Sequence, residues 1–146
     1  MIIIFQKANE IMSSEFLSNF LYKLGNDHSY HMEDTQKIES YCQFLAGDDN
    51  QFLNTELEPV IQDFLKTSLK IFEFTAYKFH IFPSRQTGGN PRLCLAPNLN
   101  IDREGDGSLE QMKKYDRLTT ELESLIDELR EKYRIVRSVI KSTLII

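Results

Sequence analysis

The stretch that decides the fold is SLEQMKKYDRLTTELESLIDELREKYRIVRSVIKS, residues 108–142. It contains neither Gly nor Pro, and its apolar residues recur at helical spacing, so it predicts one uninterrupted amphipathic helix. At about 1.5 Å per residue this helix is roughly 52 Å long, whereas an ordinary domain of this chain length is only about 30 to 35 Å across. The helix therefore belongs to an elongated body, or it reaches beyond its domain toward a partner.

The apolar seam of this helix is the first candidate interface. Its successive steps of 4, 3, 4, 4, 3, 4 and 4 residues are closer to an eleven-residue repeat than to a heptad, which predicts a nearly straight element. A heptad zipper would place Lys132 in the seam. Two interpretations remain open: the seam packs on its own domain, or it mediates self-association. The candidate interface residues are Leu118, Leu122, Leu125, Leu129, Tyr133, Val136 and Ile140, and the series ends at Leu144.

Both ends of the long helix carry recognisable signals. Ser108 and Gln111 can form a capping box, and Gly105 and Gly107 interrupt the chain just before it. Acidic residues gather toward the start of the helix and basic residues toward its end, which complements the helix macrodipole. We interpret the basic end as a helix stabiliser, with an anion-binding tail as the alternative.

The remaining chain predicts three further helices and a small sheet. Apolar spacing indicates helices at 7–24, 34–46 and 55–72, separated by polar loops at 25–33 and 47–54, with Gly25 as the first stop signal. Residues 77–82, 92–95 and 98–101 alternate as strands do, and residues 2–5 could add another strand.

The predicted fold class is therefore α+β and mostly helical. It has about four helices, including the long one at about 108–142, and a small antiparallel hairpin or three-stranded sheet at about 77–101. We expect a single helical domain spanning 1–146, with the β-hairpin as an insertion.

Composition excludes several classes of protein. The net charge of −5 is unlike the basic excess of a dedicated DNA-binding protein. No run of 18 apolar residues is present, so we expect no membrane association, and the apolar start lacks a basic leader; a cytoplasmic protein is expected. Cys42 and Cys94 are expected to be reduced thiols, because one possible bridge is weak evidence for secretion.

The loop at 83–92 is the first candidate ligand site. It is longer than most hairpin loops and combines two arginines with a Gly-Gly turn. Such groups can bind the phosphate of a nucleotide or nucleic acid, here through Lys78, His80, Arg85 and Arg92. The spacing is not that of a P-loop. A loop without any ligand, or one that contacts another protein, is the alternative.

An acidic cluster formed by Asp102, Glu104 and Asp106 is the second candidate, for a divalent metal. It begins like a calcium-binding loop, but the twelfth position is Lys113 where an EF-hand requires Glu. The alternative is that these acids favour the start of the long helix. His28 and His31 form a weaker metal candidate, and surface polar residues are the ordinary explanation for them.

No sequence motif indicates catalysis or a cofactor. The leading hypothesis is therefore a non-enzymatic interaction or assembly protein, which self-associates or packs on a protein partner through the long helix. A phosphate, nucleotide or nucleic-acid binding module using the 83–92 loop is the alternative. A metal-dependent hydrolase or nuclease using the 102–106 cluster is the third hypothesis.

Overall fold

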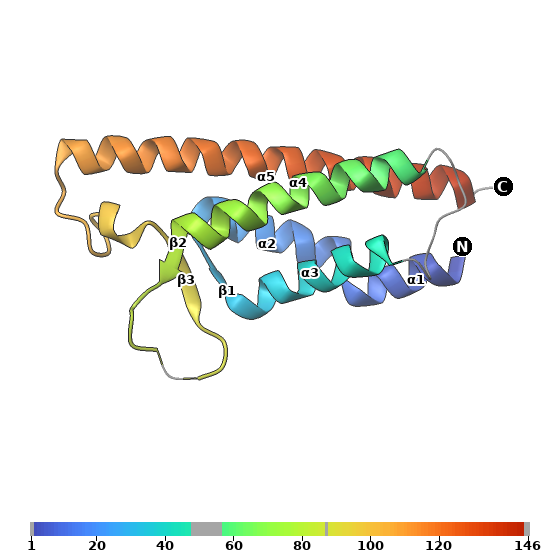
Figure 1. Ribbon diagram of the computed structural model, residues 1–146, viewed down its shortest axis with the longest axis horizontal. Coiled ribbons are helices and arrows are strands. Elements are labelled where there is room, and N and C mark those ends of the chain that lie inside the picture. Colours follow the sequence, from blue (N-terminus) through green and yellow to red (C-terminus); the bar gives the residue numbers. More distant parts are fainter. Residues whose placement is uncertain (1, 48–56, 87, 145–146) are drawn as a thin grey trace.

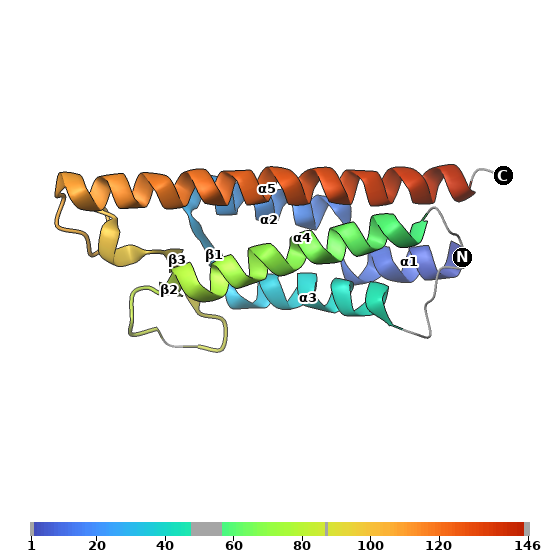
Figure 2. The same ribbon diagram turned by 45° about the horizontal axis from the view of Figure 1, so that its top comes forward.

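The computed structural model describes residues 2–47, 57–86 and 88–144. Its outline is elongated, because helix α5, Leu109–Leu144, runs along the whole length of the molecule (Figure 1). The remaining helices lie beside the later part of α5, and its first turns extend beyond them (Figures 1 and 2). Among the described helices, none combines the length and the apolar character that a membrane crossing requires.

Five α-helices form in the described part of the chain, and the predicted fold class is confirmed. The most extensive helix–helix packing is between α4 and α5, and α2 also packs on α5. The expected helix start at 55 and most of the expected loop at 47–54 lie outside the described residues. The four helices besides α5 are α1 (Ile2–Ile11), α2 (Ser14–Asp27), α3 (Met32–Ala46) and α4 (Leu57–Lys78).

The expected helix at 7–24 is two helices in the structure. The first ends at Ile11, and Ser13 caps the second, since its Oγ accepts a hydrogen bond from the Phe16 amide at 3.1 Å. Residues 2–5 belong to α1 and not to a strand, because Phe5, Ala8 and Met12 follow a helical period onto the core. Gly25 lies inside α2, which ends three residues later at a left-handed cap residue.

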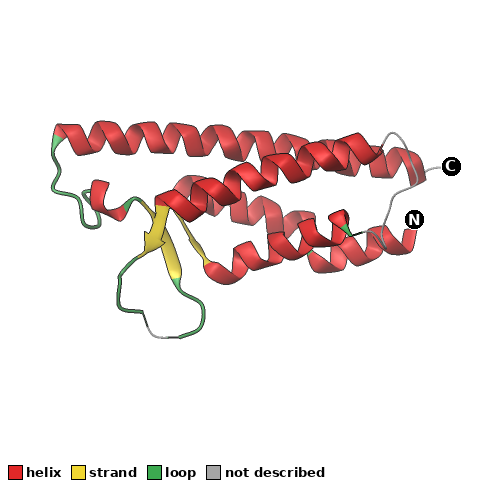
Figure 3. Cartoon of the chain, viewed as in Figure 1, coloured by secondary structure: helices red, strands yellow, loops and turns green. Residues whose placement is uncertain are grey.

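Three short antiparallel strands form the sheet, in the order β1–β3–β2, at one end of α2, α3 and α4 (Figure 3). Strand β1 is Ser29–His31, β2 is Phe79–Ile81 and β3 is Arg92–Leu95. The central strand pairs Tyr30 with Leu93 on one side and Phe79 with Leu95 on the other. These four side chains share the face that packs on the core.

Two details of the expected sheet are wrong. Residues 77 and 78 continue α4, because the helical period of Ile71, Phe74 and Thr75 runs directly into them. Residues 98–101 form no strand: they fall in a 3-10 turn, η2 (Pro97–Leu99), and the bend after it. The third strand comes from the polar stretch at 25–33, which the sequence indicated as a loop.

One apolar core runs through the helices, and the seam of α5 belongs to it. The completely buried members include Leu122, Leu129 and Val136, whereas Leu118 and Leu125 are half-buried. Ile126 is more deeply buried than Leu125, so the buried positions from 122 to 140 follow heptad steps of 4, 3, 4, 3 and 4. A heptad seam that runs through Ile126 does not contain Lys132, so the expected argument against heptad packing was wrong. The side chain of the last seam residue, Leu144, lies outside the described part.

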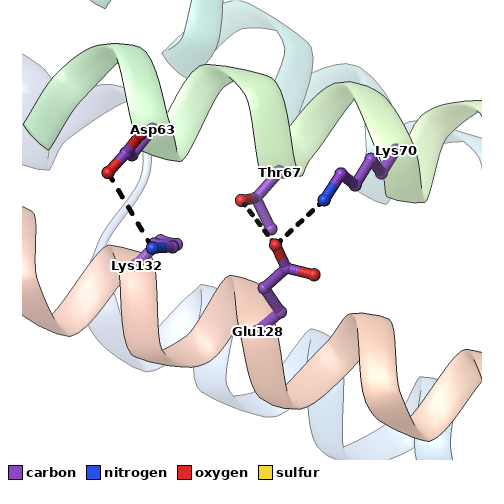
Figure 4. A network of polar contacts seen from close by, with 5 residues as sticks. All are labelled: Asp63, Thr67, Lys70, Glu128 and Lys132. Atoms are coloured by element: carbon purple, nitrogen blue, oxygen red, sulfur yellow. Dashed lines mark hydrogen bonds and ion pairs between the residues drawn. The ribbon is translucent and has the colours of Figure 1, made fainter. Parts of the chain in front are cut away.

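Polar contacts join α4 to α5 along one side of α5 (Figure 4). Glu128 accepts hydrogen bonds from Lys70 Nζ at 3.1 Å and from Thr67 Oγ1 at 3.4 Å. One turn further along α5, Lys132 Nζ lies 3.8 Å from the Asp63 carboxylate. Because these pairs bridge the two helices beside the buried seam, α4 covers this flank of α5.

Candidate functional site

The four residues expected to bind an anion do not meet at one place. Lys78 is exposed at the end of α4, and Arg85 is exposed in the loop that projects from the sheet (Figure 1). His80 and Arg92 share the outer face of the sheet, but the Arg92 guanidinium donates to Ser29 Oγ at 3.0 and 3.2 Å. Lys78 and Arg92 border two different hollows of the described structure.

The loop at 83–92 has structural contacts of its own. The Gln86 side chain bonds to both backbone groups of Arg92, at 2.7 and 2.9 Å. Asn90 Oδ1 accepts a hydrogen bond from the Glu33 amide at 2.9 Å, in the first turn of α3, whose own cap residue His31 makes no side-chain cap. Asn90 of the loop therefore caps the N-terminus of α3.

Of the acidic residues at 102–106, Asp106 contacts the start of α5. Asp106 Oδ1 accepts from the Ser108 amide at 2.8 Å, which lowers the pKa of Asp106. Ser108 Oγ accepts from the Gln111 amide at 3.3 Å, but the Gln111 side chain accepts from the Asp106 amide, so only half of the expected capping box forms. No group of three His, Cys, Asp or Glu side chains in the described chain could hold a metal ion, Asp102 and Glu104 included.

The first turns of α5 are tied to the end of α2 by a set of residues that we term the overhang cluster: His28, Asn100, Arg103 and Tyr115. The Tyr115 hydroxyl lies 2.8 Å from His28 Nδ1 and accepts from Asn100 Nδ2 at 3.2 Å. Arg103 donates to the Asp27 carbonyl at 2.9 Å. Burial, and then the Arg103 charge, lower the pKa of His28. His28 is thus engaged in a structural contact.

Gly107 allows the chain to enter α5 over this cluster. Its φ of 77° lies in the left-handed region, and a Cβ at this position would lie 2.7 Å from Ile101 Cδ1. The side chains of Leu109 and Met112, in the first turns of α5, remain exposed. These first turns of α5, which we term the overhang, therefore present separate exposed apolar side chains.

A well-formed hollow of the described structure is a groove between α2 and α5. It consists of two parts that share Leu21, Asp127 and Arg130: a larger one of about 550 Å³ and a smaller one of about 330 Å³. We term both together the α2–α5 groove. The α2 residues that line it are Ser14, Leu17, Ser18, Leu21, Tyr22, Gly25 and Asn26.

The groove has an apolar floor and a charged wall. Leu17, Leu21 and Tyr133 form its floor and are almost fully buried. The Tyr133 hydroxyl is buried without a well-formed hydrogen bond to the described residues, and burial raises its pKa. The wall along α5 carries Asp127, Arg130, Glu131, Arg134, Arg137 and Lys141.

The two cysteines play no part in the groove. Both are free, as expected from the sequence. Burial raises the pKa of the Cys42 thiol to about 11, so this residue is protonated at neutral pH. Cys94 is completely buried on the outer face of the central strand.

Comparison of the chain with known protein families, curated proteins and solved structures finds no match. The site is therefore described by its own geometry. The sequence indicated α5 as the binding element but selected the seam that the chain buries within its own core. The charged residues from 127 to 134 were the sequence signal that could have indicated the groove-lining face of α5. Ser18 and Tyr22 line the groove only because α2 lies beside α5, and sequence spacing does not reveal that neighbour.

Proposed function

We propose that this protein is a non-enzymatic interaction protein that docks a helix of a protein partner in the α2–α5 groove. The observation that carries the proposal is that α4 covers one flank of α5, whereas the opposite flank, toward α2, is hollow. The proposal keeps the long helix as the binding element. It moves the contact from the buried seam to the face beside it.

The size and chemistry of the groove suit such a partner. A hollow of about 550 Å³ falls in the range of well-formed binding sites, and here it lies lengthwise between two helices. An amphipathic helix can place apolar anchors over Leu17, Leu21 and Tyr133 while its polar side chains meet the charged wall. Desolvation of the floor would supply affinity, and the wall would select orientation.

We place this activity in the cytoplasm. The supporting observation is that both thiols, Cys42 and Cys94, are free, as is usual for proteins in a reducing compartment.

Site-specific photo-crosslinking tests the groove. A benzoylphenylalanine at Ser18, on the groove wall, is expected to crosslink to a protein in the cells that express this chain. The matched control is the same residue at Lys66, which is exposed on α4 outside the groove. A crosslinked product from Ser18 alone supports the proposal. No product from Ser18, or equal products from both positions, contradicts it.

A further inference from the structure

Between residues 127 and 134, the charges along the groove wall of α5 alternate in sign. Asp127, Arg130, Glu131 and Arg134 all line the larger hollow, and their side chains are between half and four-fifths exposed. In an antiparallel copy of the helix, the same positions meet in reverse order. Asp127 then faces Arg134 of the second copy, and Arg130 faces Glu131, with both pairs centred between residues 130 and 131.

We propose that the α2–α5 groove holds a second copy of this chain, packed antiparallel across a two-fold axis that passes between residues 130 and 131 of α5. This inference rests on the proposed function, because it names the partner for the same groove. A two-fold contact is self-complementary by definition: if residue i meets residue j, then j meets i. The sequence of charges has this property, so the axis creates four opposite-charge pairs.

The same order of charges selects the antiparallel arrangement. In a parallel pairing, Asp127 would face Asp127 and Arg130 would face Arg130. Like charges directly opposite each other are strongly disfavoured at an interface.

Charges already paired within one chain remain available to the second copy. Arg130 lies 3.4 Å from Asp127, and Arg134 lies 2.7 Å from Glu131, each three residues along the helix. These pairs are exposed and individually weak. A second copy therefore extends two isolated pairs into one network.

The shape of the groove agrees with the two-fold axis. Tyr22 borders the smaller hollow and is 68% exposed, the most exposed large apolar residue of α2. The smaller hollow lies toward Glu123 on α5, and the larger one lies toward Lys141. Reversal about a point between 130 and 131 places the Tyr22 ring of each copy over the larger hollow of the other. An aromatic side chain thereby fills each cavity in the dimer.

Sedimentation equilibrium with three variants of the whole protein tests this arrangement. Arg130→Glu sets a negative charge against Glu131 of the second copy. The dissociation constant of the dimer is therefore expected to rise at least about tenfold. The double reversal R130E/E131R restores the opposite charges between copies and is expected to restore dimerisation. It does so although it destroys both ion pairs within each chain.

The matched control is the double reversal D127R/R130E. It preserves an ion pair between positions 127 and 130 of one chain, but it sets like charges against both 131 and 134 of the second copy. Dimerisation is expected to be weaker than in Arg130→Glu alone. If the two double variants behave alike, the charges act within one chain only and the proposed axis is wrong.

Two further variants locate the interface. Tyr22→Ala should weaken the dimer, whereas Met112→Ser, on the overhang, should leave it unchanged. Loss of the dimer in Met112→Ser but not in Tyr22→Ala would assign the contact to the overhang and overturn the inference. Circular dichroism confirms that each exposed substitution leaves the helices intact.

The outcomes also separate this inference from the proposed function. If the wild-type chain stays monomeric at high micromolar concentration, no second copy occupies the groove and the inference fails. A crosslink from position 18 to a different protein would then still support the groove as a docking site. The absence of any crosslink would refute both.

Discussion

Between Leu122 and Ile140, α5 buries at least one side chain in every turn, whereas none of its side chains between Leu109 and Thr119 is fully buried. The first region is held by apolar contacts with α2 and α4. The second makes partly buried contacts through Tyr115 and Leu118 and is also held by the Ser108 cap and the overhang cluster. The difference shows that one continuous helix can owe its stability to burial in one part and to specific hydrogen bonds in another.

Truncation of the buried seam should have the largest effect. Leu129→Ala removes a completely buried side chain and leaves a cavity in the core, so we expect a loss of about 2–5 kcal/mol in the free energy of unfolding. Leu109→Ala, at a position 67% exposed in the overhang, should change it by less than about 0.5 kcal/mol. Urea denaturation measures both values. Equal losses would abolish the distinction between the two regions.

The overhang should respond to the loss of one hydroxyl group. Tyr115→Phe keeps the ring but leaves His28 Nδ1 and Asn100 Nδ2 without this partner, which should cost about 1–2 kcal/mol. Hydrogen exchange should show weaker protection in the first turns of α5 and little change after Leu122. Tyr77→Phe is the control, because the Tyr77 side chain is 77% exposed. A uniform loss of protection along α5 would contradict separate modes of stabilisation.

A smaller effect is expected at the polar margin between α4 and α5. Glu128→Gln removes the charge that Lys70 pairs with, on a partly exposed surface, so the loss should be below about 1 kcal/mol and should shrink as salt is added. Glu121→Gln, at an exposed position of the same helix, serves as the control. A loss as large as that of Leu129→Ala would show that polar contacts also dominate the buried region.

The smallest expected effect is a change in stability that occurs only at acidic pH. Burial and the Arg103 charge hold the pKa of His28 below its ordinary value of 6.5, so the folded protein binds this proton less readily than the unfolded chain. The contribution of His28 to stability is thus constant above pH 6.5, falls as the pH drops from 6.5 toward the lowered pKa, and levels off below it.

His28→Asn isolates this contribution. Asn tolerates the left-handed backbone of this position, where φ is 52°, and it carries no titrating proton. The variant should lose the part of the acid dependence that begins near pH 6.5. Denaturation midpoints measured from pH 7.5 to 5 would show an unchanged slope if His28 were not responsible.

Much of the fold could be predicted because helix formation is local. The spacing of apolar residues in 108–142 predicted α5 to within two residues at either end, and Ser108 was recognised as its cap. The predictions that were wrong concern positions where tertiary contacts decide between two local possibilities. Ile126 rather than Leu125 enters the core, because the direction in which α5 meets its neighbours decides which of two adjacent apolar residues is buried.

The candidate sites were harder to predict, because each depends on distant segments. Lys78, His80, Arg85 and Arg92 are close in sequence, yet the hairpin directs Arg92 to Ser29, 63 residues earlier in the chain. The α2–α5 groove likewise requires residues more than 100 positions apart to lie side by side. A charge pattern in one helix indicates an exposed face but does not identify its neighbour.

The sequence by itself determined that this protein is mostly helical, that its last quarter is one long helix, and that this helix has one apolar and one charged side. These properties follow from the helical period and from end signals within a few residues of each other. Only the tertiary structure decided that the apolar side is used within the chain and that β1 arises from a polar segment. It also decided that α2 leaves a groove open beside the charged side. Burial and strand pairing depend on which segments meet, and that is a property of the whole folded chain.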